Sequence, residues 1–165
     1  MLKPVLQALV LADHVYQDKL TGKMVIAGTF GRAYFVKAAA KQPAETSGAS
    51  EQVAGQPRKL MWHEVARAGS PFAYISLTEI RGVVPIELRF VDLEENIVLI
   101  RAELSVTAKS PLDTAEFTVP LPPLPIPHAG IYALELLTND EPLGALRVTA
   151  IEGPGPNQKA EEEQR

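Results

Sequence analysis

The sequence predicts an all-β protein, more narrowly an immunoglobulin-like antiparallel β-sandwich of about eight strands. Apolar and polar residues alternate with a period of two over most of the chain, as in half-buried strands. In addition, the proline-rich segment 120–127 leads into Gly130-Ile131-Tyr132. This pattern is typical of a sandwich corner, where a tyrosine at the start of a late strand hydrogen-bonds to upstream backbone. We therefore expect Tyr132 to be buried, with His128 capping the corner at the surface.

Alternation predicts eight strands. They span residues 5–16, 24–30, 72–80, 85–92, 97–107, 116–121, 131–137 and 143–151. Gly22 can supply the positive φ angle that a tight turn between the first two strands needs. Pro142 can begin an edge strand at little cost.

The fourth and fifth predicted strands, residues 85–92 and 97–107, form the central hairpin. Pairing Phe90 with Val98 places Glu87 across from Arg101, whereas pairing Phe90 with Ile100 opposes like charges. Because like charges directly opposite each other destabilise a sheet, we expect the first register. It leaves a three-residue turn, residues 93–95.

Composition sets the domain organisation. A chain of 165 residues, 46% hydrophobic, can form one core but not two large ones. We expect one sandwich domain over residues 1–152, with a long insertion between the second and third strands. The small, polar residues 37–59 predict a mobile part of that insertion, and residues 153–165 predict a disordered tail.

Charge and residue types exclude several functions. The net charge of −4 and the lack of a basic run argue against nucleic-acid binding. The apolar run between Pro4 and Asp13 is shorter than a signal peptide, which takes ~15 to 30 residues, and no stretch is long enough for a membrane helix. These observations predict a cytoplasmic protein without membrane contact.

Catalytic signals are missing from the sequence. It has no cysteine, no Gly-x-Ser-x-Gly elbow and no phosphate-binding glycine loop, so we expect no enzyme and no cofactor. His14, His63 and His128 stand in separate regions without the paired spacing of a zinc site, so no metal site is expected. The Pro-x-x-Pro pattern near residue 122 lacks a flanking arginine and is interpreted as a structural connector.

One surface feature points to binding. The first hairpin has apolar residues on both faces, and both faces therefore need cover. The candidate interaction surface consists of Leu9, Leu11, Val25, Ala27 and Trp62. Either the Trp62 segment folds over this hairpin, or a second copy or another protein does. The sequence thus predicts a non-catalytic protein-binding or assembly module.

The alternative function is a carbohydrate- or calcium-binding sandwich. Sugar binding needs exposed aromatic side chains, for which Trp62, Tyr74 and Tyr34 are the candidates. Calcium binding needs oxygen ligands from neighbouring turns. The candidate calcium ligands are Asp18, Asp92, Glu94, Glu95, Asn139, Asp140 and Glu141. Strand direction places the turn at residues 92–95 and the turn at 139–141 at opposite ends, which leaves Asp18 and Asp140 as companions.

Two motifs resemble those of a known family. Ala12-Asp13-His14-Val15-Tyr16 followed by Thr21-Gly22-Lys23, and later residues 119–122 and 130–132, resemble an uncharacterised bacterial domain-of-unknown-function family of small β-sandwich proteins. The resemblance covers most of residues 5–151 and lapses over the insertion. It implies the fold and a bacterial cytosolic setting, and it supplies no binding or catalytic residues.

Overall fold

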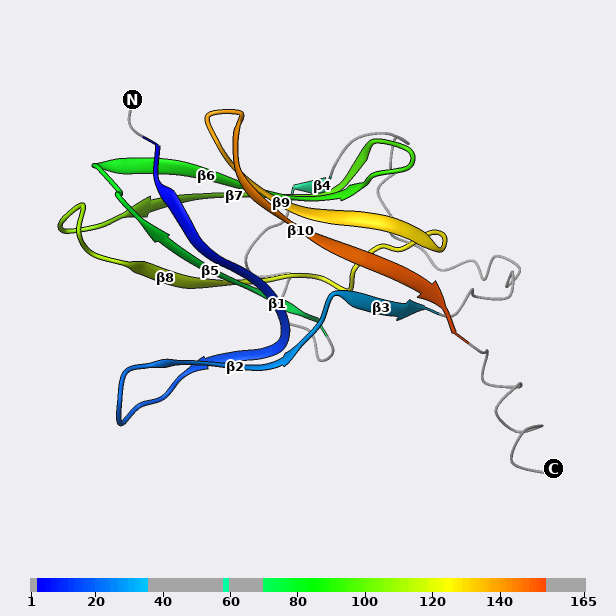
Figure 1. Cartoon of the computed structure of the whole chain (residues 1–165), viewed down its shortest axis with the longest axis horizontal. Helices are drawn as coiled ribbons and strands as arrows, with labels where there is room; N and C mark the ends of the chain where they lie inside the picture. The colour runs from blue at the N-terminus through cyan, green and yellow to red at the C-terminus, as the bar shows by residue number, and fades with distance from the viewer. Residues whose placement is uncertain (1–2, 36–57, 60–69, 154–165) are drawn as a thin grey trace, which may run out of the picture.

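The described part of the chain forms ten β-strands arranged in two sheets, shown in the computed structural model in Figure 1. The structure describes residues 3–35, 58–59 and 70–153, and these residues include no helix. Each of the eight predicted segments overlaps a strand, so the all-β prediction is confirmed. The predicted number of strands is too low, because two short strands, at 32–35 and 58–59, were not expected.

The first sheet has the strand order β2-β1-β5-β8 and is antiparallel throughout. Its strands are β1 (Val5–Gln17), β2 (Met24–Thr29), β5 (Phe72–Thr78) and β8 (Ala115–Pro120). Gly22, in the turn between β1 and β2, has a φ of 69°, in agreement with the positive φ expected for a tight turn. β2 and β8 form the two edges of this sheet.

The second sheet has the order β3-β10-β9-β6-β7-β4. Its strands are β3 (Arg32–Phe35), β4 (Arg58–Lys59), β6 (Val83–Asp92), β7 (Ile97–Thr107), β9 (Gly130–Thr138) and β10 (Glu141–Glu152). β3 and β4 run parallel to their neighbours, and the other pairs are antiparallel. A two-residue link carries the chain from β2 in the first sheet to β3 in the second.

The core lies between the two sheets. Leu11, Ile75 and Leu77 from the first sheet are fully buried in the same cluster as Phe90 and Leu134 from the second. Alternate residues along β6 enter this cluster, which explains the period-two pattern in the sequence. Burial of this apolar surface is the main source of stability in a chain without disulfides.

The register predicted for the central hairpin is wrong. Phe90 pairs with Ile100, which places Arg89 opposite Arg101. A β-bulge between Phe90 and Val91 shifts the pairing by one residue and leaves residues 93–96 as a four-residue turn. The like-charge pairs are tolerated because Glu87 binds both arginines at once.

A second bulge corrects the prediction for the first strand. The register of β1 against β5 shifts between Leu6 and Ala8, so that Leu6 and Leu9 face the same side. This side is the core, and Leu11, one of the predicted surface residues, is completely buried there. Because of the bulge, counting with a period of two placed Leu9 and Leu11 on the face opposite Leu6 and so assigned them to the surface.

Parts of the predicted domain organisation fall outside the described residues. The predicted mobile segment 37–59 lies outside them apart from Arg58 and Lys59, which form β4. Trp62 and His63 also lie outside, as does the tail beyond Gly153.

Candidate functional site

The corner predicted around Tyr132 is present. The Tyr132 side chain is fully buried, and its hydroxyl donates a hydrogen bond of 2.9 Å to the backbone carbonyl of His128. Its ring stacks on Phe90, with ring centroids 5.4 Å apart and planes inclined by 8°. Burial raises the pKa of the Tyr132 hydroxyl, although its hydrogen bond to His128 opposes this shift. The corner therefore fixes the position of His128 relative to β6.

Asp92 ends β6 next to this corner and is almost completely buried, with 1% of its surface exposed. Its Oδ1 accepts hydrogen bonds from the backbone N–H groups of Glu94 (2.9 Å) and Glu95 (3.2 Å). The Leu93 N–H donates to the Ile131 carbonyl, which ties the turn to β9. The carboxylate of Asp92 is thus fixed by the fold of the β6–β7 turn.

His128 faces the other carboxylate oxygen of Asp92. Nε2 of His128 lies 2.8 Å from Oδ2 of Asp92 and 3.9 Å from Oε1 of Glu95. On the other side of the ring, Nδ1 lies 3.0 Å from the carbonyl oxygen of Ala129. Since a carbonyl oxygen can only accept, Nδ1 must carry a proton. The structure therefore brings His128 together with an acidic turn that lies far from it in the sequence.

Asp92 and His128 each stabilise the charged form of the other. Hydrogen bonding of Nδ1 to Ala129 raises the pKa of His128, and the nearby Asp92 carboxylate raises it further, against the effect of desolvation. Burial alone would raise the pKa of Asp92, but the N–H groups of Glu95 and Glu94 and the positive His128 lower it. Both shifts favour a negative Asp92 beside a cation.

Glu94 and Glu95 lie on different sides of the imidazole. The Glu94 carboxylate is 4.0 Å from Nδ1 and packs over Gly130, where an added Cβ atom would lie 2.6 Å from Glu94 Oε1. Glu95 instead approaches Nε2. Only Glu95 therefore joins Asp92 and His128 as a group whose ligand atoms all lie within 4.8 Å of one another.

No protein-family model and no curated protein matches this chain. Its function therefore has to be argued from its own surfaces and side chains.

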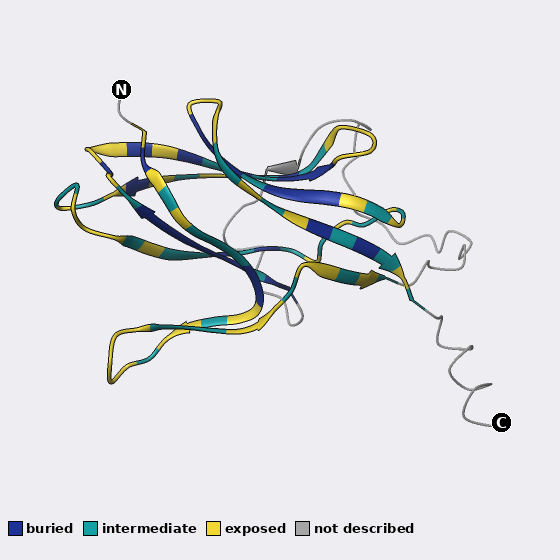
Figure 2. Cartoon of the chain, viewed as in Figure 1, coloured by how far each residue is buried: buried dark blue, intermediate teal, exposed yellow. Residues whose placement is uncertain are grey.

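The most exposed part of the described chain is the hairpin of β1 and β2. β5 pairs with β1 only as far as Ala12, so residues 13–17 of β1 pair with β2 alone. This two-stranded ribbon projects from the two sheets (Figure 1). No residue between 13 and 35 is buried, and Figure 2 shows the ribbon in the colours of exposed and intermediate residues.

Apolar side chains occupy both faces of the projecting hairpin. Tyr16 (57% exposed) pairs with Val25 on one face, and Val15 pairs with Ile26 on the other. Leu20, 96% exposed, stands at the tip. Isolated two-stranded ribbons are marginally stable in water. The hairpin thus exposes an apolar surface that nothing among the described residues buries.

The predicted interaction residues divide between this hairpin and the core. Val25 is half-buried and Ala27 is exposed, and both lie on β2 on the same face as Tyr16. Leu9 packs against the core cluster, and Leu11 is inside it. Only Val25 and Ala27 of the described candidates therefore belong to the exposed hairpin.

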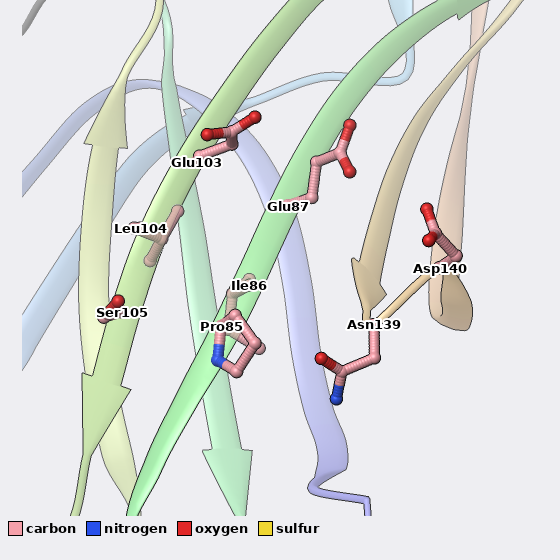
Figure 3. Close-up of a pocket in the computed structure, with 8 residues that line it drawn as sticks. All are labelled: Pro85, Ile86, Glu87, Glu103, Leu104, Ser105, Asn139 and Asp140. Atoms are coloured by element: carbon pink, nitrogen blue, oxygen red, sulfur yellow. The ribbon is translucent and has the colours of Figure 1, made fainter.

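The outer face of the second sheet carries a charged network. Arg89 binds Glu87 through two hydrogen bonds, of 2.6 and 2.9 Å, and Arg101 approaches the same carboxylate at 2.6 Å. Asp140 lies 3.4 Å from Arg89. Beside the network is an open hollow of about 460 Å³ (Figure 3). It is lined by Pro85, Ile86, Glu87, Glu103, Leu104, Ser105, Asn139 and Asp140.

The candidate calcium ligands do not meet in the predicted way. Asp18 binds within its own turn, accepting hydrogen bonds from the Leu20 N–H and the Thr21 hydroxyl, and hydrogen bonding from Leu20 lowers its pKa. Asp140 instead pairs with Arg89. The β1–β2 and β9–β10 turns lie far apart in Figure 1, so Asp18 and Asp140 share no site.

The tyrosines predicted for sugar stacking lie in different sheets. Tyr74, on β5, is 7% exposed and donates a hydrogen bond to Glu116. Tyr34, on β3, is 71% exposed. These two rings therefore form no common platform. Among the residues described, there is also no helix long and apolar enough to cross a membrane.

Proposed function

We propose that this protein is a non-catalytic protein-binding or assembly module that uses the projecting β1–β2 hairpin. The observation that carries this proposal is the run of residues 13–29 without a single buried position, in a ribbon with apolar side chains on both faces. Exposed apolar surfaces of this kind mark interaction sites. Burial against a partner would also stabilise a ribbon that is marginal by itself.

The edge strand β2 supports a second copy of the chain as the partner. Among the described residues, β2 pairs with β1 on one side only, so its other side offers N–H and C=O groups for strand addition. Antiparallel pairing of two β2 strands would be symmetric, as homodimer interfaces are. It would also bring Lys23, at the start of one β2, near Asp13 beside the end of the other.

The two packed sheets and the Tyr132 corner also support a finer description of the fold. A buried tyrosine that hydrogen-bonds to backbone four residues upstream is a hallmark of immunoglobulin-like sandwiches. We include in the proposal an immunoglobulin-like sandwich in a bacterial cytoplasmic setting. The resemblance of the Ala12–Tyr16 and Thr21–Lys23 motifs to a domain-of-unknown-function family supports this setting.

Light scattering coupled to size exclusion tests the assembly. We expect the 17.9 kDa wild-type chain to elute as a dimer at tens of micromolar. The variant Val25→Lys should be monomeric, because it places a charge within the self-paired edge strand.

The matched control is Val83→Lys. Val83 is 69% exposed at the start of β6, in the other sheet, so the same substitution there should leave the dimer intact. A monomeric wild type across this concentration range would reject assembly through the hairpin. Equal effects of the two lysines would reject the location of the interface.

A further inference from the structure

The contact between Asp92 and His128 needs a positive charge between its two atoms. Nδ1 of His128 donates to Ala129, so a neutral imidazole has its lone pair on Nε2. That lone pair would face the Asp92 Oδ2 lone pairs at 2.8 Å. Two lone pairs at this distance repel each other unless a proton or a metal ion lies between them. Either cation can lie between these two atoms.

A metal ion can take the place of that proton. Nε2 and Oδ2 are buried and 2.8 Å apart, so a protonated His128 forms an ion pair with Asp92, although the N–H group is not aligned as in an ideal hydrogen bond. A metal ion bound to both atoms lies off the line between them. Two ligands about 2.1 Å from a tetrahedral ion lie roughly 3.4 Å apart, so Nε2 and Oδ2 would move slightly apart when the ion binds.

The third ligand and the surroundings agree with this interpretation. Oε1 of Glu95 is 3.9 Å from Nε2, which is within about 0.5 Å of this spacing. The Glu95 side chain is 59% exposed and is free to close on an ion. Metal-binding histidines usually donate their other N–H to a carbonyl or carboxylate, as His128 does to Ala129. Metal-binding carboxylates are also hydrogen-bonded, as Asp92 is to two backbone N–H groups.

We propose that Asp92, Glu95 and His128 bind a divalent transition metal ion. One imidazole nitrogen and two carboxylate oxygens suit zinc and its neighbours, whereas calcium prefers oxygen ligands alone. Three protein ligands leave at least one coordination position for water or a partner's side chain. The site lies at the opposite end of β9 from the β9–β10 turn, and it does not include the projecting hairpin.

Calorimetric titration of the metal-stripped, untagged, full-length protein with zinc chloride at pH 7.5 tests this site. We expect one high-affinity equivalent. Glu95→Gln should weaken it at least about tenfold, since even the loss of an outer-shell group costs 10–100-fold. Asp92→Asn and His128→Gln should abolish it. Cobalt(II) supplies a second readout, because its visible absorption reports a nitrogen ligand and should change in His128→Gln.

Glu94→Gln is the matched control, because it removes the same charge from the neighbouring residue, whose carboxylate lies over Gly130 and not at Nε2. His14→Gln controls for an exposed histidine elsewhere. Both controls should bind zinc as the wild type does. The site would be overturned by weak, non-stoichiometric binding in the wild type, or by equal losses in Glu94→Gln and Glu95→Gln. Because Glu95 is largely exposed, its variant should fold even if those at Asp92 and His128 do not.

Discussion

Replacing Tyr132 with alanine is expected to lower the free energy of unfolding by about 3–5 kcal/mol. The side chain is fully buried, stacks on Phe90 and hydrogen-bonds to His128, so alanine leaves a cavity and an unpaired carbonyl. Urea denaturation followed by circular dichroism measures the change. Tyr132→Phe keeps the ring and should cost only about 1–2 kcal/mol, the share of the hydroxyl.

Tyr34→Ala is the control for this prediction. Tyr34 is 71% exposed, so its removal should change the free energy of unfolding by no more than about 0.5 kcal/mol. A loss below about 1 kcal/mol in Tyr132→Ala would show that the corner does not hold the two sheets together.

Replacing Glu87 with alanine should cost about 2 kcal/mol, roughly the value of a hydrogen bond to a charged group. Arg89 and Arg101 are directly paired across β6 and β7, and Glu87 lies between their guanidinium groups. Without its carboxylate, two positive charges face each other. Glu141→Ala, at an exposed pair with Lys3, should cost almost nothing. Equal losses in the two variants would contradict the importance of the network.

The stability contributed by Glu87 should also depend on pH. The Arg89 hydrogen bond lowers the pKa of Glu87 below its ordinary value of 4.5, against the effect of burial. A carboxyl whose folded pKa is depressed stabilises the protein above its unfolded pKa, and this stabilisation is lost as the pH falls through the folded pKa. The difference in unfolding free energy between wild type and Glu87→Ala should be constant from pH 8 to 6 and shrink below about pH 4.5. A difference independent of pH would rule out a charged Glu87 as its cause.

The sequence predicts strands well where apolar and polar residues alternate over a long segment, so that the two faces of the strand differ in polarity. β3 was missed because four residues of a short parallel strand, Arg32–Phe35, carry too little alternation to be noticed. The wrong hairpin register and the wrong surface assignment of Leu9 and Leu11 have one cause, since each arises at a bulge that adds a residue to one strand. The prediction rejected the observed hairpin register because it considered only like charges on directly opposite residues, such as Arg89 and Arg101. Glu87 reaches both arginines, and this reach cannot be deduced from pairing alone.

The candidate site was only partly predictable. The sequence indicated that Tyr132 is buried and that the first hairpin is rich in apolar residues on both faces. It gave no reason to connect Asp92 with His128, because 36 positions separate them and neither belongs to a metal-binding motif. The feature of the sequence that could have connected them was the predicted Tyr132 corner. A tyrosine that binds the carbonyl of residue 128 while stacking on Phe90 must hold that residue near the end of β6.

The parallel pairing of β3 with β10 has a consequence for how the chain folds. Arg32 pairs with Thr149, which lies 117 positions later in the sequence, and β1 pairs with the distant strand β5. In contrast, the β6–β7 and β9–β10 hairpins pair strands that are adjacent in the sequence. Distant pairings are slow to form because a long loop must close first. During synthesis, the apolar first hairpin therefore emerges well before its strands find their places in the sheets. Its exposed edge is then most vulnerable to aggregation, so a chaperone or early pairing with another copy would matter most at this stage.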